Sequence, residues 1–143
     1  MEQLRTESEG EPALTRVVVI DDHPWVRRGL IALISTEKHF EVCGQAEDAV
    51  GAIAVVEECN PDLAIVDISI KGPIDGLELT KRLKSSHPGL VVLILSLHAA
   101  SEYGARAYAA GASAYLCKSE VNDSLFETLR RITNPKPIPS NCV

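Results

Sequence analysis

The sequence is poor in aromatic residues, and this scarcity limits how its core can be built. Aromatic residues make up only 4% of the chain, whereas apolar residues as a whole make up 45%. A core of that size must therefore consist mainly of Val, Leu, Ile and Ala side chains, which are often fully buried in proteins. With 143 residues, the chain has the length of one ordinary domain and leaves little room for a second.

Four further features are missing, and each argues against a class of protein. The formal net charge is −6, whereas nucleic-acid binders normally carry a basic stripe that neutralises phosphates. No apolar run approaches the roughly 18 residues of a membrane span, and residues 1–16 lack the apolar centre of a signal peptide. The cysteines form no C-x-x-C pair or zinc spacing, which predicts free thiols in a reducing cytoplasm: Cys43, Cys59, Cys117 and Cys142.

The two ends of the chain differ in composition from the part between them. Residues 1–15 are polar and acidic, which predicts a flexible N-terminal extension. Residues 134–143 contain Pro135, Pro137 and Pro139, which exclude a helix and indicate a tail or a linker stub. We therefore expect one folded domain over residues 16–133.

Within that domain, short apolar runs alternate with helical patterns. The runs predict strands at 16–20, 41–44, 63–66, 90–95 and 112–116. Those at 16–20 and 63–66 are typical of buried strands, whereas the one at 41–44 is weak. Apolar stripes predict the first three helices, with core positions Val26, Leu30, Leu33 and Ile34, then Val50, Ile53 and Val56, then Leu77, Leu79 and Leu83.

Two more helices complete the alternation. One is expected over 102–110 with Gly111 as its C-terminal cap, and one from about 122, with Leu125, Leu129 and Ile132 on its core face. Strands that alternate with helices predict an α/β fold with a five-stranded parallel sheet, doubly wound with helices on both faces.

Polar side chains follow four of the apolar runs, at the point where each predicted strand ends. Asp21 and Asp22 follow the first run, Asp67 the third, Ser96 the fourth and Lys118 the fifth. Each residue alone is explained as well by a turn, a helix cap or a surface charge. However, the carboxyl ends of parallel strands share one edge, where ligands bind in open α/β sheets. We therefore expect these side chains to converge.

Three converging carboxylates repel one another unless a cation lies among them. Mg²⁺ prefers oxygen ligands and commonly combines one or two carboxylates with phosphate oxygens. A lysine beside them supplies a point charge for a phosphate group. The pattern therefore indicates a Mg²⁺ site that handles phosphate.

Several motifs in the same order resemble the receiver domains of two-component response regulators over residues 16–133. The opening and the ending are most like the receivers attached to LuxR-type helix-turn-helix domains. The motifs are Val-Ile-Asp21-Asp22-His23-Pro24, the strand ending at Asp67, Asp75-Gly76-Leu77-Glu78-Leu79, Leu95-Ser96 and Gly111-Ala-Ser-Ala-Tyr115-Leu-Cys-Lys118. The resemblance implies a flavodoxin-like (βα)5 fold.

The resemblance also implies a role for each residue at the predicted site. Asp67 would accept a phosphoryl group, and Asp22 and Asp67 would bind Mg²⁺ directly, together with the backbone carbonyl of Ser69. Asp21 would act mainly through a metal-bound water, and Lys118 would pair with the phosphoryl oxygens.

Two further residues would form the switch. Ser96 would donate a hydrogen bond to the phosphoryl group, and Tyr115 would turn inward when Ser96 moves. Such a protein is not an enzyme in the ordinary sense but a phosphoacceptor with intrinsic self-phosphorylation and autodephosphorylation chemistry.

The sequence departs from the commonest family pattern at three places near the site. The loop after Asp67 is longer by one residue, with Lys71 where proline is usual. Ser119 stands where many relatives have proline, so that a cis peptide bond there is not expected with the same force. Leu97 is bulkier than the small residue often found beside the switch hydroxyl.

Three other readings compete with an active receiver. A degenerate receiver would act as a phosphorylation-independent interaction module, against which the complete residue set argues. A Mg²⁺-dependent phosphatase with an Asp nucleophile would normally have a second Asp where this chain has Ser69. A flavodoxin-like electron carrier would need a Ser/Thr/Gly-rich phosphate loop where this chain has Asp21 and Asp22.

The expected partners are a histidine kinase or phosphotransfer protein as phosphodonor, and a protein target on the switch face. We expect no nucleic-acid or membrane partner for the chain as given, and a homodimer remains open. If the reading frame continues past Val143, an attached domain would carry the output. The histidines form no metal set by spacing, although His98, two residues after Ser96, is a candidate neighbour of the phosphoryl group.

Overall fold

The computed structural model describes residues 14–133, in which five strands alternate with five α-helices. The acidic extension expected over 1–15 lies outside the described residues up to residue 13, and so does the tail expected over 134–143. The elements in chain order are β1 (Thr15–Ile20), α2 (Pro24–Ile34), β2 (Phe40–Ala46), α3 (Ala49–Cys59), β3 (Leu63–Asp67), α4 (Gly76–Ser86), β4 (Val91–Ser96), α5 (Ala100–Ala109), β5 (Ala114–Cys117), a 3₁₀ turn (Lys118–Glu120) and α6 (Val121–Thr133).

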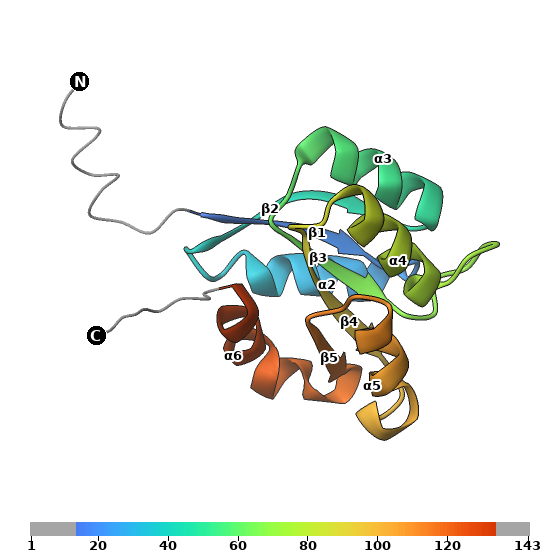
Figure 1. The fold of residues 1–143 in the computed structure, drawn as a ribbon. Coiled ribbons are helices and arrows are strands. Elements are labelled where there is room, and N and C mark those ends of the chain that lie inside the picture. The colour runs from blue at the N-terminus through green and yellow to red at the C-terminus, as the bar shows by residue number, and fades with distance from the viewer. Residues whose placement is uncertain (1–13, 134–143) are drawn as a thin grey trace, which may run out of the picture.

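All five strands are parallel and lie in the order β2-β1-β3-β4-β5 (Figure 1). The sheet is therefore doubly wound, as predicted. The direction of winding changes between β1 and β3, which pair from Val17 with Leu63 to Ile20 with Val66. In doubly wound sheets, ligands bind beyond the carboxyl ends of the strands at this change of direction.

Helices cover both faces of the sheet and divide the core into two apolar clusters. On one face, α3, α4 and α5 pack against alternate strand residues such as Val18 and Val66. On the other face, α2 and α6 pack against the residues between them, such as Val19 and Ile65. Because both faces are covered, the central strands are buried almost completely and read as continuous apolar runs.

The core face of α3 differs from the predicted one. Ala49, Ala52 and Val56 are buried, whereas Val50 is 78% exposed and Ile53 is 40% exposed. The helix is apolar on several sides, so the apolar stripe alone did not identify the buried face. Alanines lie against the sheet because the helix approaches it closely.

The other helical stripes agree with the structure more closely. Leu30 and Ile34 of α2 are buried, Leu33 is partly buried and Val26 is 36% exposed. In α4 and α6 the predicted leucines are buried. Gly111 directly follows the capping residue Ala110 of α5 and has the left-handed φ of 110° that favours glycine after a helix.

Strand boundaries differ from the predicted ones by at most two residues. β1 begins one residue earlier, at Thr15, Phe40 and Ala46 extend β2 at both ends, and β5 begins two residues later, at Ala114. Among residues 14–133, no helix is both long and apolar enough to cross a membrane.

Candidate functional site

The sheet brings the predicted site residues to one edge. Asp21 directly follows Ile20, which pairs with Val66, so Asp21 and Asp67 end neighbouring strands. Ser96 is the last residue of β4, next to β3, and Lys118 directly follows β5. Parallel pairing of the strands therefore gathers residues that are far apart in the sequence, as predicted.

Three carboxylates and one ammonium group are in close contact at this edge. Asp21 and Asp67 are each only 1% exposed. The Nζ atom of Lys118 lies 3.4 Å from Oδ2 of Asp21 and 3.4 Å from Oδ2 of Asp67. Asp22 is close to the same group and its side chain is 7% exposed. One lysine thus contacts two of the three acidic groups.

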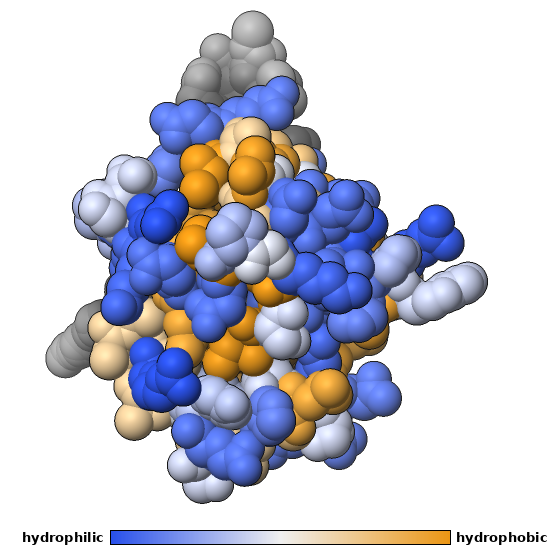
Figure 2. All heavy atoms as spheres, turned by 90° about the vertical axis from the view of Figure 1, so that its right-hand side faces the viewer, coloured by the Kyte–Doolittle hydropathy of each residue, from blue (hydrophilic) through white to orange (hydrophobic). Residues whose placement is uncertain are grey.

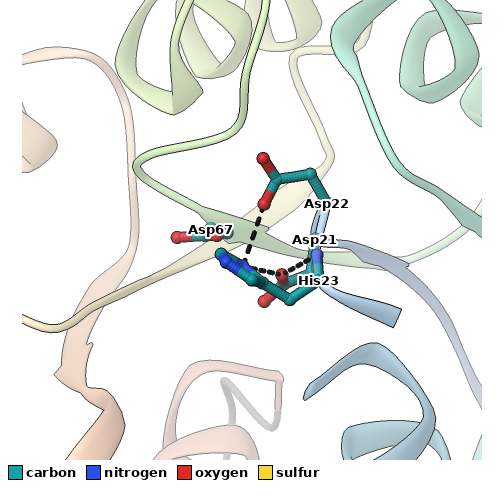
Figure 3. A group of neighbouring side chains, drawn as sticks. All are labelled: Asp21, Asp22, His23 and Asp67. Carbon is teal, nitrogen blue, oxygen red and sulfur yellow. Dashed lines mark hydrogen bonds and ion pairs between the residues drawn. The ribbon is translucent and has the colours of Figure 1, made fainter. Parts of the chain in front are cut away.

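His23 joins this cluster, which spacing along the sequence did not indicate. Its Nδ1 atom lies 3.0 Å from Oδ1 of Asp22 and 3.4 Å from Oδ1 of Asp21 (Figure 3). The ligand atoms of Asp21, Asp22, His23 and Asp67 all lie within 4.8 Å of one another. A signal was present in the sequence, because His23 immediately follows the Asp pair.

One oxygen of each carboxylate is buried and makes an ion-pair contact but no hydrogen bond. Oδ2 of Asp21, Oδ1 of Asp22 and Oδ2 of Asp67 are buried and have no hydrogen-bond partner. Burial raises the pKa of Asp21; the backbone N–H of His23 and the charge of Lys118 oppose this rise, whereas the charge of Asp67 adds to it. Clustered carboxylate oxygens that lack hydrogen bonds fit a hard divalent cation, because Mg²⁺ takes carboxylate oxygens and offsets their repulsion.

Hydrogen bonds from Ser69 and the close start of α4 fix the surroundings of Asp67. Its Oδ1 atom accepts hydrogen bonds from the backbone N–H of Ser69 at 3.1 Å and from the Ser69 hydroxyl at 3.2 Å. Helix α4 begins against the end of β3, and a Cβ atom on Gly76 would lie 2.4 Å from the carbonyl oxygen of Asp67. The Asp75 side chain caps this helix by accepting from the backbone N–H of Glu78. The Asp-Gly pair thus lets the helix start beside the acidic cluster.

The long loop after Asp67 also contacts the site. The backbone N–H of Lys71 donates to Oδ2 of Asp22 at 3.1 Å. Lys71 stands where proline is usual in the family pattern, and proline has no N–H to donate. This departure therefore supplies a hydrogen bond to the acidic cluster.

Ser96 and Tyr115 are linked through the backbone of His98. The hydroxyl of Ser96, which is fully buried, accepts from the N–H of His98 at 3.0 Å. The Tyr115 hydroxyl donates to the carbonyl of His98 at 2.8 Å, and burial raises the pKa of this phenol. The structure thus joins the two predicted switch residues through His98, and Ser96 makes its hydrogen bond there and not to the carboxylates.

The two other departures from the family pattern are Leu97 and Ser119. Leu97 is 77% exposed and lines a surface groove together with Val26 and Lys118, so it lies beside the site. No peptide bond in residues 14–133 is cis, including the bond between Lys118 and Ser119. Figure 2 shows the side of the molecule toward which the strands end, where apolar patches lie among hydrophilic residues.

Comparisons with known proteins agree with this geometry. Residues 17–130 match the family model of the response regulator receiver domain. The chain is 36% identical over 115 residues to the transcriptional regulatory protein DegU of Brevibacillus brevis, covering 80% of this chain and 48% of that protein. It is also 36% identical over 105 residues to the DNA-binding transcriptional activator DevR/DosR of Mycobacterium tuberculosis, covering 73% of this chain and 48% of that protein.

Solved structures show the same resemblance. A LuxR-family two-component response regulator from Aurantimonas sp. SI85-9A1 superposes with a TM-score of 0.80 at 30% identity, covering 85% of this chain and 86% of that one. The receiver domain of the response regulator NarL from Mycobacterium tuberculosis has a TM-score of 0.73 at 28% identity, with 84% and 99% covered. The chain spans about half the length of the curated relatives it matches. Its fold, its acidic strand edge and these matches together place it in the family of two-component response regulator receiver domains, with LuxR-family regulators among its relatives.

Proposed function

We propose that Asp67 accepts a phosphoryl group from a histidine kinase or a phosphotransfer protein, with Mg²⁺ bound among Asp21, Asp22 and Asp67. One observation carries the proposal: three buried carboxylate oxygens without hydrogen bonds lie together, two of them ion-paired to Lys118 and the third beside His23. Three carboxylates buried together are expensive, because one lysine offsets only part of their charge. A bound cation would offset the remaining negative charge, and a phosphoryl group would pair with the cation and the lysine.

The chain's own residues have separate tasks in this reaction. The Asp67 carboxylate attacks the phosphorus, so that an O–P bond forms while the P–N bond of a phosphohistidine donor breaks. The bonding pair stays on the leaving nitrogen, which takes a proton from solvent. No base is required, because a carboxylate can attack in its ionised form. Bound Mg²⁺ would supply positive charge that offsets the charge on the transferred group.

Lys118 and Ser69 position the reacting carboxylate. Lys118 is only 14% exposed at its side chain and lies 3.4 Å from Asp67, so its ammonium is placed to pair with phosphoryl oxygens. Ser69 holds Oδ1 of Asp67 through its N–H and hydroxyl. The metal-ligand role expected for the Ser69 carbonyl remains part of the proposal.

Ser96 and Tyr115 would pass the change to the surface. When Asp67 carries a phosphoryl group, the Ser96 hydroxyl turns and donates a hydrogen bond to a phosphoryl oxygen. It then gives up the hydrogen bond that it accepts from the backbone N–H of His98. The hydrogen bond that Tyr115 makes to the same residue is then disturbed, and the face formed by α5 and β5 changes. The chain acts here as a phosphoacceptor that also dephosphorylates itself, not as an enzyme with a separate substrate.

A phosphorylation assay tests the central step. The protein is incubated with Mg²⁺ and a small acyl phosphate donor, and its intact mass is measured. We expect a mass gain of one phosphate that disappears in Asp67→Asn and depends on Mg²⁺. Asp62→Asn is the matched control, because Asp62 precedes β3, at the end of the strand opposite to Asp67, and Asn can still accept its hydrogen bond from the Arg16 N–H. Retained labelling in Asp67→Asn would refute the assignment.

The metal part of the proposal has its own test. Asp22→Ala removes one carboxylate of the cluster, so Mg²⁺ binding measured by calorimetry should weaken about 10-fold or more and phosphorylation should slow. Titration like the wild type would place the metal elsewhere. Failure of the wild-type protein to gain phosphate would favour the alternative of a degenerate receiver that binds partners without phosphorylation.

We also propose that the chain signals through a protein target on the switch face. Relatives such as DevR/DosR are DNA-binding activators about twice as long as the matched region, so an attached DNA-binding domain is the corresponding proposal for a longer protein. A copurification assay with and without phosphodonor tests whether partner binding follows the switch.

A further inference from the structure

Two cysteines meet between β2 and α3, although they are far apart in the sequence. Cys43 lies in the middle of β2, and Cys59 is the last residue of α3. The Sγ atom of Cys59 donates a hydrogen bond to the carbonyl oxygen of Cys43 at 3.2 Å. The two thiols are also within hydrogen-bonding reach of each other, and both side chains pack against the same apolar cluster. The contact therefore brings two sulfur atoms together.

An irregularity in β2 produces this contact. Val18 of β1 pairs with Gly44, where an uninterrupted register would pair it with Cys43, so Cys43 is an extra residue in its strand. A bulge of this kind changes the direction of the side chains beside it. Here Cys43 and Gly44 both face α3, because a Cβ atom on Gly44 would lie 3.1 Å from Sγ of Cys59. The missing side chain at Gly44 thus leaves the space in which the two thiols meet.

Both thiols are open to small reagents and have a positive charge beside them. Cys43 and Cys59 are free and partly exposed. The Arg16 guanidinium donates to the carbonyl oxygen of Cys59. Burial raises the pKa of the Cys43 thiol and the neighbouring Cys59 adds to this rise, whereas the charge of Arg16 opposes it. Because the thiolate is the reactive form, Cys43 is the group that reacts second, with a sulfur already oxidised beside it.

We propose that Cys43 and Cys59 are a redox-active pair, which a peroxide converts to an intrachain disulfide that fastens α3 to β2. The Cys59 thiolate attacks one peroxide oxygen, the O–O bond breaks, and a sulfenic acid forms. The Cys43 thiolate then attacks this sulfur, the S–S bond forms, and hydroxide leaves. In balance, two thiols and one hydrogen peroxide give one disulfide and two water molecules.

The pair is separate from the proposed phosphorylation site. Cys59 contacts Arg16 near the beginning of β1, whereas Asp21 follows the other end of the same strand. A disulfide between two residues that are 16 positions apart would restrict the unfolded chain and so stabilise the fold. Oxidation should therefore raise the temperature of unfolding without a change at the acidic cluster.

A purely structural role for the two cysteines predicts a different result. Free cysteine also serves as a small apolar side chain that fills space in a core. In that role each thiol would stay reduced or would be oxidised by itself, to a sulfinic acid or a mixed disulfide. The product formed with a peroxide therefore separates the two roles.

The test uses hydrogen peroxide as the probe on the whole chain. Reduced protein is treated with peroxide, its remaining thiols are alkylated, and its peptides are mapped by mass spectrometry without reduction. We expect a cross-linked pair of peptides that contains Cys43 and Cys59 and disappears after treatment with dithiothreitol. Thermal unfolding of the oxidised protein should occur several degrees higher than that of the reduced protein.

Two variants complete the experiment. Cys59→Ser removes one sulfur but can still donate to the carbonyl of Cys43, so it should give neither the cross-link nor the thermal shift. Cys117→Ser is the matched control, because Cys117 is also free and partly exposed but lies on β5, at the opposite edge of the sheet from β2; it should behave like the wild type. The inference fails if peroxide leaves Cys43 and Cys59 of the wild type alkylated, oxidises them singly, or links either of them to another cysteine or to a second copy of the chain.

Discussion

At the scale of single residues, the burial of carboxylates at the proposed site lowers the stability of the folded protein. Asp21 is almost completely buried beside Asp67, and burial raises its pKa above the ordinary value of 3.8. A carboxyl group whose pKa is raised on folding binds its proton more tightly in the folded state. Its contribution to stability is therefore fully present below pH 3.8 and is lost as the pH rises through the folded-state pKa.

This sign leads to a prediction for Asp21→Asn in a buffer with a metal chelator. Asn cannot ionise, so the variant should unfold at a higher temperature than the wild type at pH 7, and the advantage should shrink toward pH 3. Thermal unfolding followed by circular dichroism across this pH range measures the difference. An advantage that is the same at every pH would show that ionisation of Asp21 is not its cause.

The backbone of His98 is the second decisive feature at the residue scale. It accepts from Tyr115 and donates to Ser96, while its imidazole lies 2.9 Å from Glu102 and packs on the Tyr103 ring, with centroids 5.0 Å apart. The connecting loop is thus held to β4 and β5 through its backbone and to α5 through the imidazole. His98 is placed beside the switch pair rather than in the acidic cluster.

Ser96→Ala should therefore separate phosphorylation from its consequence. The variant should still accept phosphate on Asp67, but the Tyr115 ring resonances should no longer shift on phosphorylation. Loss of the hydrogen bond from His98 should also cost about 1 kcal/mol of stability. NMR spectra with and without phosphodonor measure the shift, and Ser113→Ala, at an exposed position, is the control. A full wild-type shift in Ser96→Ala would rule out the coupling.

At the scale of elements, close approaches of helices to strands position the site. Helix α4 starts so near the end of β3 that only a hydrogen fits at Gly76. Helix α3 lies near β2 in a similar way, because a Cβ atom on Gly44 would lie 2.5 Å from Val55. These contacts involve backbone or packed side chains, which move with difficulty in a dense interior.

Gly76→Ala should consequently destabilise the protein by about 1–3 kcal/mol, as overpacking does, and should weaken Mg²⁺ binding by displacing Asp67. Gly29→Ala is the matched control in α2, where a Cβ atom would meet nothing within 4 Å. Because alanine is the better helix former, Gly29→Ala should instead stabilise by about 0.5–1 kcal/mol. Urea unfolding measures both, and equal effects of the two substitutions would contradict the close approach.

At the scale of the whole molecule, the net charge of −6 governs long-range interactions. The described residues form one receiver fold with an acidic strand edge. A surface with this charge repels a polyanion, since binding to DNA depends on neutralising its phosphates.

We therefore predict that the chain as given does not bind DNA, even at low salt where electrostatic attraction would be strongest. Fluorescence anisotropy of a labelled duplex titrated with the protein measures this. Saturable, sequence-specific binding by this chain would contradict the prediction. Binding that appears only when the chain is joined to a further domain would agree with it.

The order of apolar runs and polar residues along the chain by itself determined the parallel, doubly wound sheet. It also determined the meeting of Asp21, Asp22, Asp67 and Lys118, because parallel strands buried on both faces must end at a common edge. Only the tertiary structure decided which face of α3 is buried, since that helix is apolar on several sides. Packing also placed His23 over the carboxylates and His98 between the switch residues, because both depend on contacts between segments that are distant in the sequence or on loop geometry that no periodicity encodes.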